Sequence, residues 1–194
     1  MKKIIIALLL FACNRGFAQN CKPDVKTTDK FTKETIVAWQ CDLYDNTFAE
    51  ALTSTGTWNS TIKFDRSGET NHLTVYLVKN ESSAQNATFE SPYKGENGKE
   101  ILFGFTSGSP LKFKVTDAST ISQMNNMAGA LFTTITLSIT LTTEDMDQMR
   151  KAFSSGKLNA VRLNLANNMT IEKDIKEKKA IKINEKVSCF LAYP

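Results

Sequence analysis

Apolar and polar residues alternate between Leu131 and Leu141, and this is the clearest pattern in the chain. One series consists of Leu131, Thr133, Ile135, Leu137, Ile139 and Leu141, and the residues between them are Phe132 followed by Thr and Ser. Side chains of a strand point alternately to the two faces of its sheet, so a period of two indicates a strand with one face in the core. We therefore predict a half-buried strand here.

A short helix is predicted directly after this strand, at about residues 143–153. The segment Thr142–Asp145 offers a threonine hydroxyl that can cap the first free amides, and two acids for the positive end of the helix dipole. An apolar stripe at helical spacing follows, made of Met146, Met149 and Phe153. Gly156 should end the helix in the left-handed conformation, and residues 161–165 then alternate as a second strand.

The same alternation recurs along the rest of the chain. It predicts further strands at about residues 35–43, 58–64, 73–77, 101–105, 111–115 and 181–191. Long polar connections are expected over 79–100, with a short strand near 87–89, and over 117–130, whereas 46–56 fits either a helical turn or a loop. The predicted fold is mainly β: an antiparallel two-layer sandwich-like domain of about eight strands with one short helix.

The first 18 residues have the pattern of an export signal. Met1–Lys3 is basic, and residues 4–12 form an apolar run that is too short for a stable membrane anchor. Gly16–Ala18 then places small residues at the minus-three and minus-one positions of a signal peptidase site. We expect a signal peptide over 1–18 and a single β-rich domain over 19–194, located in the periplasm or secreted.

A second route of processing stays open. Residues 10–13, Leu-Phe-Ala-Cys, resemble a bacterial lipobox, in which Cys13 would be acylated and become the new N-terminus. The protein would then be an outer-membrane lipoprotein. Lipidation at Cys13 is the only route by which the sequence predicts attachment to a membrane.

Removal of the signal also removes most of the basic excess. The whole chain has 24 Lys and Arg against 20 Asp and Glu, which gives a net charge of +4. Because Lys2, Lys3 and Arg15 lie in the signal, the predicted mature domain has a net charge of +1. A charge so close to zero gives no support for a nucleic-acid partner.

Three cysteines remain in the mature domain: Cys21, Cys41 and Cys189. Export into an oxidising compartment makes one disulfide plausible and leaves one thiol over. The sequence allows all three pairings. Cys21 with Cys189 is favoured, because this bond would tie the two ends of the domain together and leave Cys41 as a small buried hydrophobe. Cys41 and Cys189 both fall at inward positions of predicted strands.

Residues with recognisable chemistry are scarce. His72 is the only histidine, and the sequence has no C-x-x-C pair, nucleophile elbow, phosphate-binding loop or dinucleotide-binding glycine pattern. We therefore predict no catalytic residue, no metal site and no cofactor. His72 is out of phase with its apolar neighbours Leu73, Val75 and Leu77, so it should face solvent.

The two ends of the mature chain carry a resemblance. The stretch NCKPDVKTTDKFTKETIVAW and the closing pattern LTTEDMDQMRKAF, KLNAVRLNL and KINEKVSCFL are similar to those of a loose group of uncharacterised exported proteins from gram-negative bacteria. Members have an early cysteine, an acidic residue before Phe-Thr, a β-rich middle and a late cysteine in the last strand. The resemblance implies an extracytoplasmic β-sandwich-like domain and brings no established activity with it.

Two functional hypotheses follow. The first is an exported non-catalytic binding or structural module of the bacterial cell envelope, whose partner, an unknown envelope protein or glycan, contacts residues 79–100 and 117–130. The alternative is a secreted hydrolase acting on glycan or peptide through His72 and loop carboxylates. Those carboxylates are Asp65, Glu69, Glu90, Glu96 and Glu100. Acids are common in turns, so no pair among them is favoured.

Overall fold

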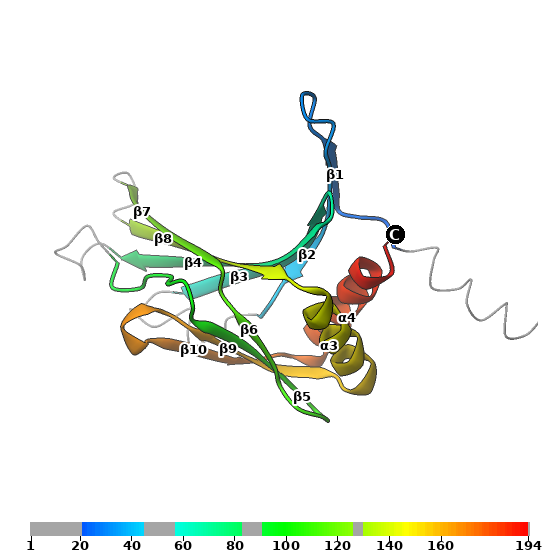
Figure 1. The fold of residues 1–194 in the computed structure, drawn as a ribbon. Helices are drawn as coiled ribbons and strands as arrows, with labels where there is room; N and C mark the ends of the chain where they lie inside the picture. The colour runs from blue at the N-terminus through cyan, green and yellow to red at the C-terminus, as the bar shows by residue number, and fades with distance from the viewer. Residues whose placement is uncertain (1–20, 45–56, 83–90, 126–129, 194) are drawn as a thin grey trace, which may run out of the picture.

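The structure, a computed structural model, describes residues 21–44, 57–82, 91–125 and 130–193 (Figure 1). These ranges contain ten strands, two α-helices and one short 3-10 helix. The elements in chain order are β1 (Val25–Thr28), β2 (Thr35–Asp42), β3 (Thr57–Ser67), β4 (Thr70–Ser82), β5 (Glu100–Phe105), β6 (Leu111–Lys114), β7 (Asp117–Asn125), β8 (Ala130–Leu141), α3 (Thr143–Ser155), β9 (Leu158–Asn164), η3 (Ala166–Asn168), β10 (Thr170–Asp174) and α4 (Glu177–Ala192).

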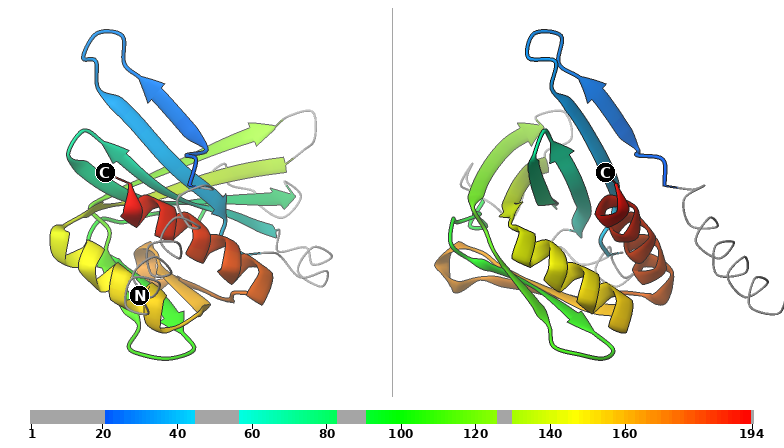
Figure 2. Two further views of the ribbon diagram at one scale, coloured as in Figure 1. Left: turned by 90° about the vertical axis from the view of Figure 1, so that its right-hand side faces the viewer. Right: turned by 45° about the vertical axis from the view of Figure 1, so that its right-hand side comes forward.

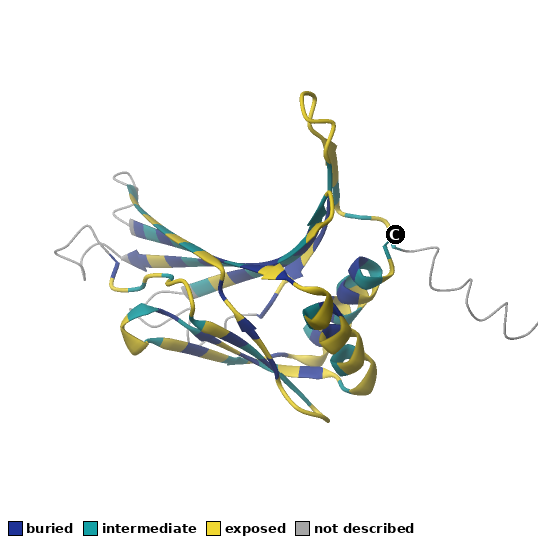
Figure 3. Ribbon diagram, in the orientation of Figure 1, coloured by how far each residue is buried: buried dark blue, intermediate teal, exposed yellow. Residues whose placement is uncertain are grey.

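Two antiparallel sheets form the two layers of a sandwich-like fold (Figure 1). The large sheet has six strands in the order β1-β2-β3-β4-β8-β7, and the small sheet has four in the order β10-β9-β5-β6. The inner faces are mostly buried, whereas most outer positions are half-buried or exposed (Figure 3). The predicted fold class is therefore confirmed, and so are both predicted hairpins, β3–β4 and β5–β6.

Alternation explains the long central strands. In β8 the residues Leu131, Ile135, Leu137 and Ile139 are all buried, as predicted, and β4 presents Leu73, Val75 and Leu77 to the same interior. Leu73 lies opposite Ile139, and Leu77 lies opposite Ile135. The apolar face of each strand therefore meets that of its neighbour, which removes apolar area from water along the whole sheet.

The two helices close one end of the sandwich, between the sheets (Figures 1 and 2). Helix α3 begins as predicted: the Asp145 amide donates to the Thr142 hydroxyl at 3.1 Å, and the Thr142 amide donates to the Asp145 carboxylate at 2.8 Å. Its end differs from the prediction, because Gly156 is extended with a φ of −150°. Glycine is required there by close packing, since a Cβ would lie 2.7 Å from the Ser107 carbonyl oxygen.

The predicted last strand at residues 181–191 is wrong, because this segment is the second half of helix α4. Its apolar residues can be grouped with a period of two or with the period of a helix. The buried set is Ala180, Ile183, Val187 and Phe190, which lies on one helical face, while Ile181 is 47% exposed. The charged stretch before it is strand β10 followed by the outer face of this helix.

The predicted connection over 117–130 is also wrong in its first part, which is edge strand β7. No clear alternation marks this strand, because its inward positions Ala118, Thr120 and Ser122 are small or polar. Within 79–100, β4 continues to Ser82, and 91–99 is irregular. The predicted strand near 87–89 and the ambiguous segment 46–56 lie outside the described residues.

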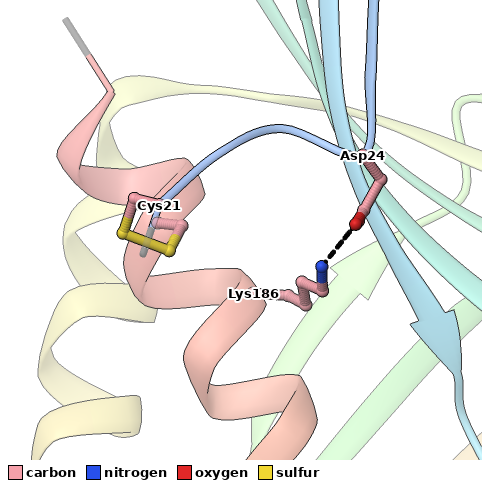
Figure 4. The surroundings of a disulfide bond; sticks show 4 residues. Cys21, Asp24 and Lys186 are labelled. Atoms are coloured by element: carbon pink, nitrogen blue, oxygen red, sulfur yellow. Dashed lines mark hydrogen bonds and ion pairs between the residues drawn. A yellow bond between two sulfur atoms is a disulfide. The ribbon is translucent and has the colours of Figure 1, made fainter. Parts of the chain in front are cut away.

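A disulfide joins Cys21 to Cys189, the pairing that the sequence favoured (Figure 4). It fixes the chain ahead of β1 to helix α4. Cys189 lies in this helix, whereas the sequence pattern predicted a strand there. Cys41 is a free buried thiol in β2, and burial raises its pKa to about 11. The disulfide fits an oxidising, extracytoplasmic environment. Neither of the two described helices is long and apolar enough to cross a membrane.

Candidate functional site

The histidine considered for a hydrolase lies on the outer face of the large sheet. His72 is half-buried in β4, directly opposite Asp65 of β3. The Asp65 carboxylate, which is itself buried, forms an ion pair with Lys63 of its own strand at 3.1 Å. Glu100 begins β5 in the small sheet, so the two sheets separate His72 and Glu100 instead of bringing them together.

The other candidate carboxylates are scattered. Glu69 is exposed in the turn between β3 and β4, and Glu96 pairs with Lys99 at 3.3 Å. Glu90 lies outside the described residues. Among the described residues, no group of three or more His, Cys, Asp and Glu side chains is placed to hold a metal ion.

A different set of residues stands out on the inner face of the large sheet. At the end of β4 far from the helices, the alternation that buries Leu73, Val75 and Leu77 continues into Lys79 and Glu81. Lys79 is only 3% exposed and Glu81 only 8%. The interior of the sandwich therefore changes from apolar to charged along a single strand.

The two charged side chains form an ion pair inside the sandwich. The Lys79 Nζ lies 2.7 Å from Glu81 Oε1. The second carboxylate oxygen, Glu81 Oε2, is buried and has no hydrogen-bond partner in the part of the chain that the structure describes. A buried carboxylate oxygen without a donor is uncommon, because its lost hydration is then uncompensated.

Two aromatic rings enclose the ammonium group. Lys79 Nζ lies 3.8 Å from the centre of the Tyr93 ring and 5.5 Å from the centre of the Trp58 ring. The rings contact each other edge to face, with centres 5.0 Å apart. Ring faces carry partial negative charge, so both stabilise the cation at this desolvated position. We call Trp58, Lys79, Glu81 and Tyr93 the inner polar cluster.

Polar residues extend from this cluster across the sheet. Four paired residues form one row across the strands β3, β4, β8 and β7. They are, in this order, Trp58, Lys79, Thr133 and Ser122. Thr133 is fully buried, and its hydroxyl lies 3.3 Å from that of Ser122. One complete row of inward positions is thus polar or aromatic. The next row still contains Ser60 and Thr120, and the apolar rows lie closer to the helices, at Ile62, Val75, Leu137 and Ala118 and at Phe64, Leu73 and Ile139.

The segment after residue 90 covers this row from inside the sandwich. The Gly95 amide donates to the Thr120 hydroxyl at 2.8 Å, and the Lys94 carbonyl accepts from the Ala166 amide at 2.9 Å. Gly95 runs so close to β8 that a Cβ would lie 3.1 Å from both Ile135 and Leu137 side chains. These contacts hold the segment so that the Tyr93 ring lies against the Lys79 ammonium.

A second polar position lies where β2 approaches β10. Tyr44 is buried, its amide donates to the Ser60 hydroxyl at 3.3 Å, and Lys173 Nζ lies 5.8 Å from the centre of its ring. Burial raises the pKa of Tyr44 to about 12, against a smaller opposing effect of Ser60. Burial also lowers the pKa of Lys173. Ser60 and Trp58 are successive inward residues of β3, so this position borders the inner polar cluster.

The energetic meaning of the cluster follows from burial. Bringing a lysine and a glutamate out of water costs several kcal/mol for each ion, and their mutual attraction often does no more than offset this cost. Apolar residues of the same size would serve the core equally well or better. Stability alone therefore does not explain why this pair is buried. Buried charged residues that do not stabilise the fold are common in binding sites.

Comparisons with protein-family models, with curated proteins and with solved structures each find no match to this chain.

The inner polar cluster is not among the predicted sites, because the polar composition of residues 79–100 predicts a connection outside the sheet. One signal was present. Lys79 and Glu81 continue the spacing of Leu73, Val75 and Leu77 without a break, and Trp58 precedes the matching series Ser60, Ile62 and Phe64. Trp58 already stands in the predicted strand at 58–64, so extending the strand at 73–77 by this period places Trp58 and Lys79 on one face.

Proposed function

We propose that this chain is an exported, non-catalytic binding module of the bacterial cell envelope, and that the inner polar cluster binds a hydroxyl-bearing ligand of the glycan class. The observation that carries the proposal is the buried oxygen Glu81 Oε2, which accepts no hydrogen bond from any described residue. A sugar hydroxyl is a neutral donor that could satisfy this oxygen without adding a second buried charge.

The surroundings of this oxygen support the same ligand class. Trp58 and Tyr93 provide apolar ring surface beside the carboxylate, and sites for small ligands combine such surface with a few placed polar groups. The ion-pair partner of Glu81 is a lysine, whereas glycoside hydrolysis requires two carboxyl groups that flank the bond. The arrangement therefore favours binding over cleavage.

The position in the chain agrees with the sequence-based hypothesis about contacts. Lys79, Glu81 and Tyr93 all fall in residues 79–100, one of the two segments expected to meet a partner. Export is supported by the signal-like residues 1–18 and by the disulfide. We place the protein in the periplasm or outside the cell, with an outer-membrane lipoprotein acylated at Cys13 as the alternative. The intact mass of the protein from its host distinguishes an N-terminus at Gln19 from an acylated Cys13.

The test is calorimetric titration of the disulfide-bonded protein with soluble peptidoglycan fragments and other envelope oligosaccharides. Glu81→Gln keeps the shape of the side chain but removes its charge. We expect it to weaken glycan binding by about tenfold or more, because hydrogen bonds to charged groups contribute roughly 1.5–3 kcal/mol.

The matched control is Asp65→Asn on the neighbouring strand. Asp65 is also a buried carboxylate paired with a lysine two residues away, but it lies on the outer face of the sheet. This variant should bind glycans like the wild type. Equal affinity of Glu81→Gln and wild type, or no binding to any oligosaccharide by wild type, would show that the cluster is not a glycan site.

A further inference from the structure

The hairpin formed by β1 and β2 projects beyond the body of the sandwich (Figures 1 and 2). Its tip consists of residues 29–34, all of which are exposed (Figure 3). Phe31 at this tip is 93% exposed, which is the largest exposure of any large hydrophobic residue in the described ranges. A whole phenylalanine side chain is thus held in water by a part of the fold that contributes almost nothing to the core.

Several contacts fix the base of this hairpin to the body. The disulfide holds Cys21, and the Asp24 carboxylate both accepts from the Gln40 amide at 2.8 Å and pairs with Lys186 at 2.6 Å (Figure 4). Ordering a segment that buries so little surface costs conformational entropy with little return from packing. A rigid, projecting hairpin is therefore better explained by a contact outside the chain.

Local hydrogen bonds fix the tip as well. One oxygen of the Asp29 carboxylate accepts from the amides of Phe31 at 2.8 Å and Thr32 at 2.7 Å. These amides hold the pKa of Asp29 below its ordinary value, so the carboxylate stays charged and keeps the turn closed. Glu34 accepts from the Ser67 hydroxyl at 2.7 Å, and Lys33 takes the left-handed conformation that the turn requires, with a φ of 62°.

The hairpin as a whole carries a positive charge. From Lys22 to Glu34 it has four lysines against the three acids Asp24, Asp29 and Glu34, and Lys186 of the body offsets Asp24, which leaves a net charge of +2. Lys30 and Lys33 lie on either side of Phe31 in the sequence, and Lys26 is exposed on β1. The Lys33 ammonium donates to the Lys30 carbonyl at 2.8 Å, which holds it at the tip. An apolar ring between lysines is complementary to an anionic surface with an apolar layer beneath it.

We infer that the tip of the β1–β2 hairpin inserts into the interfacial region of an anionic phospholipid membrane, with Phe31 among the acyl chains and Lys30 and Lys33 at the phosphates. A convex tip of six residues is too small for a stable protein interface, which needs about 800 Å² from each partner. A lipid surface imposes no such requirement. This contact is independent of the glycan proposal and involves a different part of the fold.

The test is co-sedimentation with vesicles of phosphatidylethanolamine and phosphatidylglycerol. The full chain is exported so that its disulfide forms, and it carries Cys13→Ser so that acylation cannot contribute. We expect binding that is lost when salt is raised from about 0.1 M to about 1 M, which shortens the Debye length from about 10 to 3 Å. Phe31→Ser should lower the partition coefficient about tenfold, and Lys30→Gln and Lys33→Gln about fivefold each.

The matched control is Ile121→Ser, which removes a 57% exposed apolar side chain from β7 at the other edge of the same sheet. It should leave vesicle binding unchanged. Wild-type binding by Phe31→Ser, or equal binding to phosphatidylcholine vesicles, would overturn the inference. Absence of vesicle binding together with capture of an envelope protein by a photo-crosslinker at position 31 would also overturn it and assign the tip to a protein partner.

Discussion

The two ends of the inner face of the large sheet differ in what they bury. Beside the helices, Phe64 lies 5.8 Å from Phe190 of α4, and Trp39 lies 6.2 Å from the same ring, measured between ring centres. At the other end the neighbouring strand β4 buries Lys79 and Glu81. The backbone is equally regular at both ends, so the difference lies in the side chains. The apolar end is built for stability, whereas the charged end is not.

The largest expected effect is at the apolar end. Phe190 is fully buried where α4 meets the large sheet. Phe190→Ala should lower the free energy of unfolding by about 3–5 kcal/mol, since it loses aromatic burial and leaves a cavity. The measurement is urea denaturation followed by tryptophan fluorescence. Ile181→Ala, at an exposed position of the same helix, should change stability by less than about 0.5 kcal/mol. Similar losses in both variants would contradict the claim that this helix face anchors the end.

The next effect is expected at the charged end, and it should be non-additive. Lys79→Met leaves Glu81 buried without its partner and should cost about 3 kcal/mol. Adding Glu81→Leu removes the unpaired charge, so the double variant should recover to the stability of wild type or exceed it. Denaturation of all four proteins measures the coupling. If the two losses simply add, the pair contributes to stability like an ordinary core contact, and the contrast between the two ends disappears.

Strands with a clear alternation of apolar and polar residues could be predicted from the sequence. A segment whose apolar residues fit both the period of a strand and the period of a helix could not. Strands β2, β3, β4, β5, β6, β8 and β9 and the capped helix α3 were all predicted from alternation and from local capping chemistry. Helix α4 was not, because its apolar residues also fit a strand and only packing on Trp39 and Phe64 selects the helix. Edge strands β1 and β7 are paired on one side only and bury few apolar side chains, so they lack a strong pattern.

The inner polar cluster could be predicted only in part. Its position on β4 follows from the alternation of that strand. Its other members come from β3 and from the irregular segment that contains Tyr93, and no local pattern shows that this segment folds back between the sheets. Polar residues in a sequence suggest a solvated loop, and burial of Lys79 and Glu81 depends on contacts distant along the chain.

The smallest effect concerns the ion pair that ties the hairpin to the helix-closed end. Burial raises the pKa of Asp24, but the hydrogen bond from Lys186 and the Gln40 amide outweigh it, so the folded-state pKa lies below the ordinary value of 3.8. A lowered pKa means that this contribution is complete above the unfolded-state pKa and is lost as pH falls through the folded-state pKa.

Asp24→Asn should therefore destabilise the protein by up to about 1 kcal/mol at pH 7, since the pair is partly solvated, and by almost nothing once the pH is below the folded-state pKa. Urea denaturation across the acid range measures this. Asp42→Asn breaks a second ion pair with the same helix, between Asp42 and Lys179. The Asp42 side chain is 63% exposed against 32% for Asp24, so the loss of stability in this variant should be smaller. A loss in Asp24→Asn that is equal at both pH values would mean that packing, and not charge, holds the hairpin on α4.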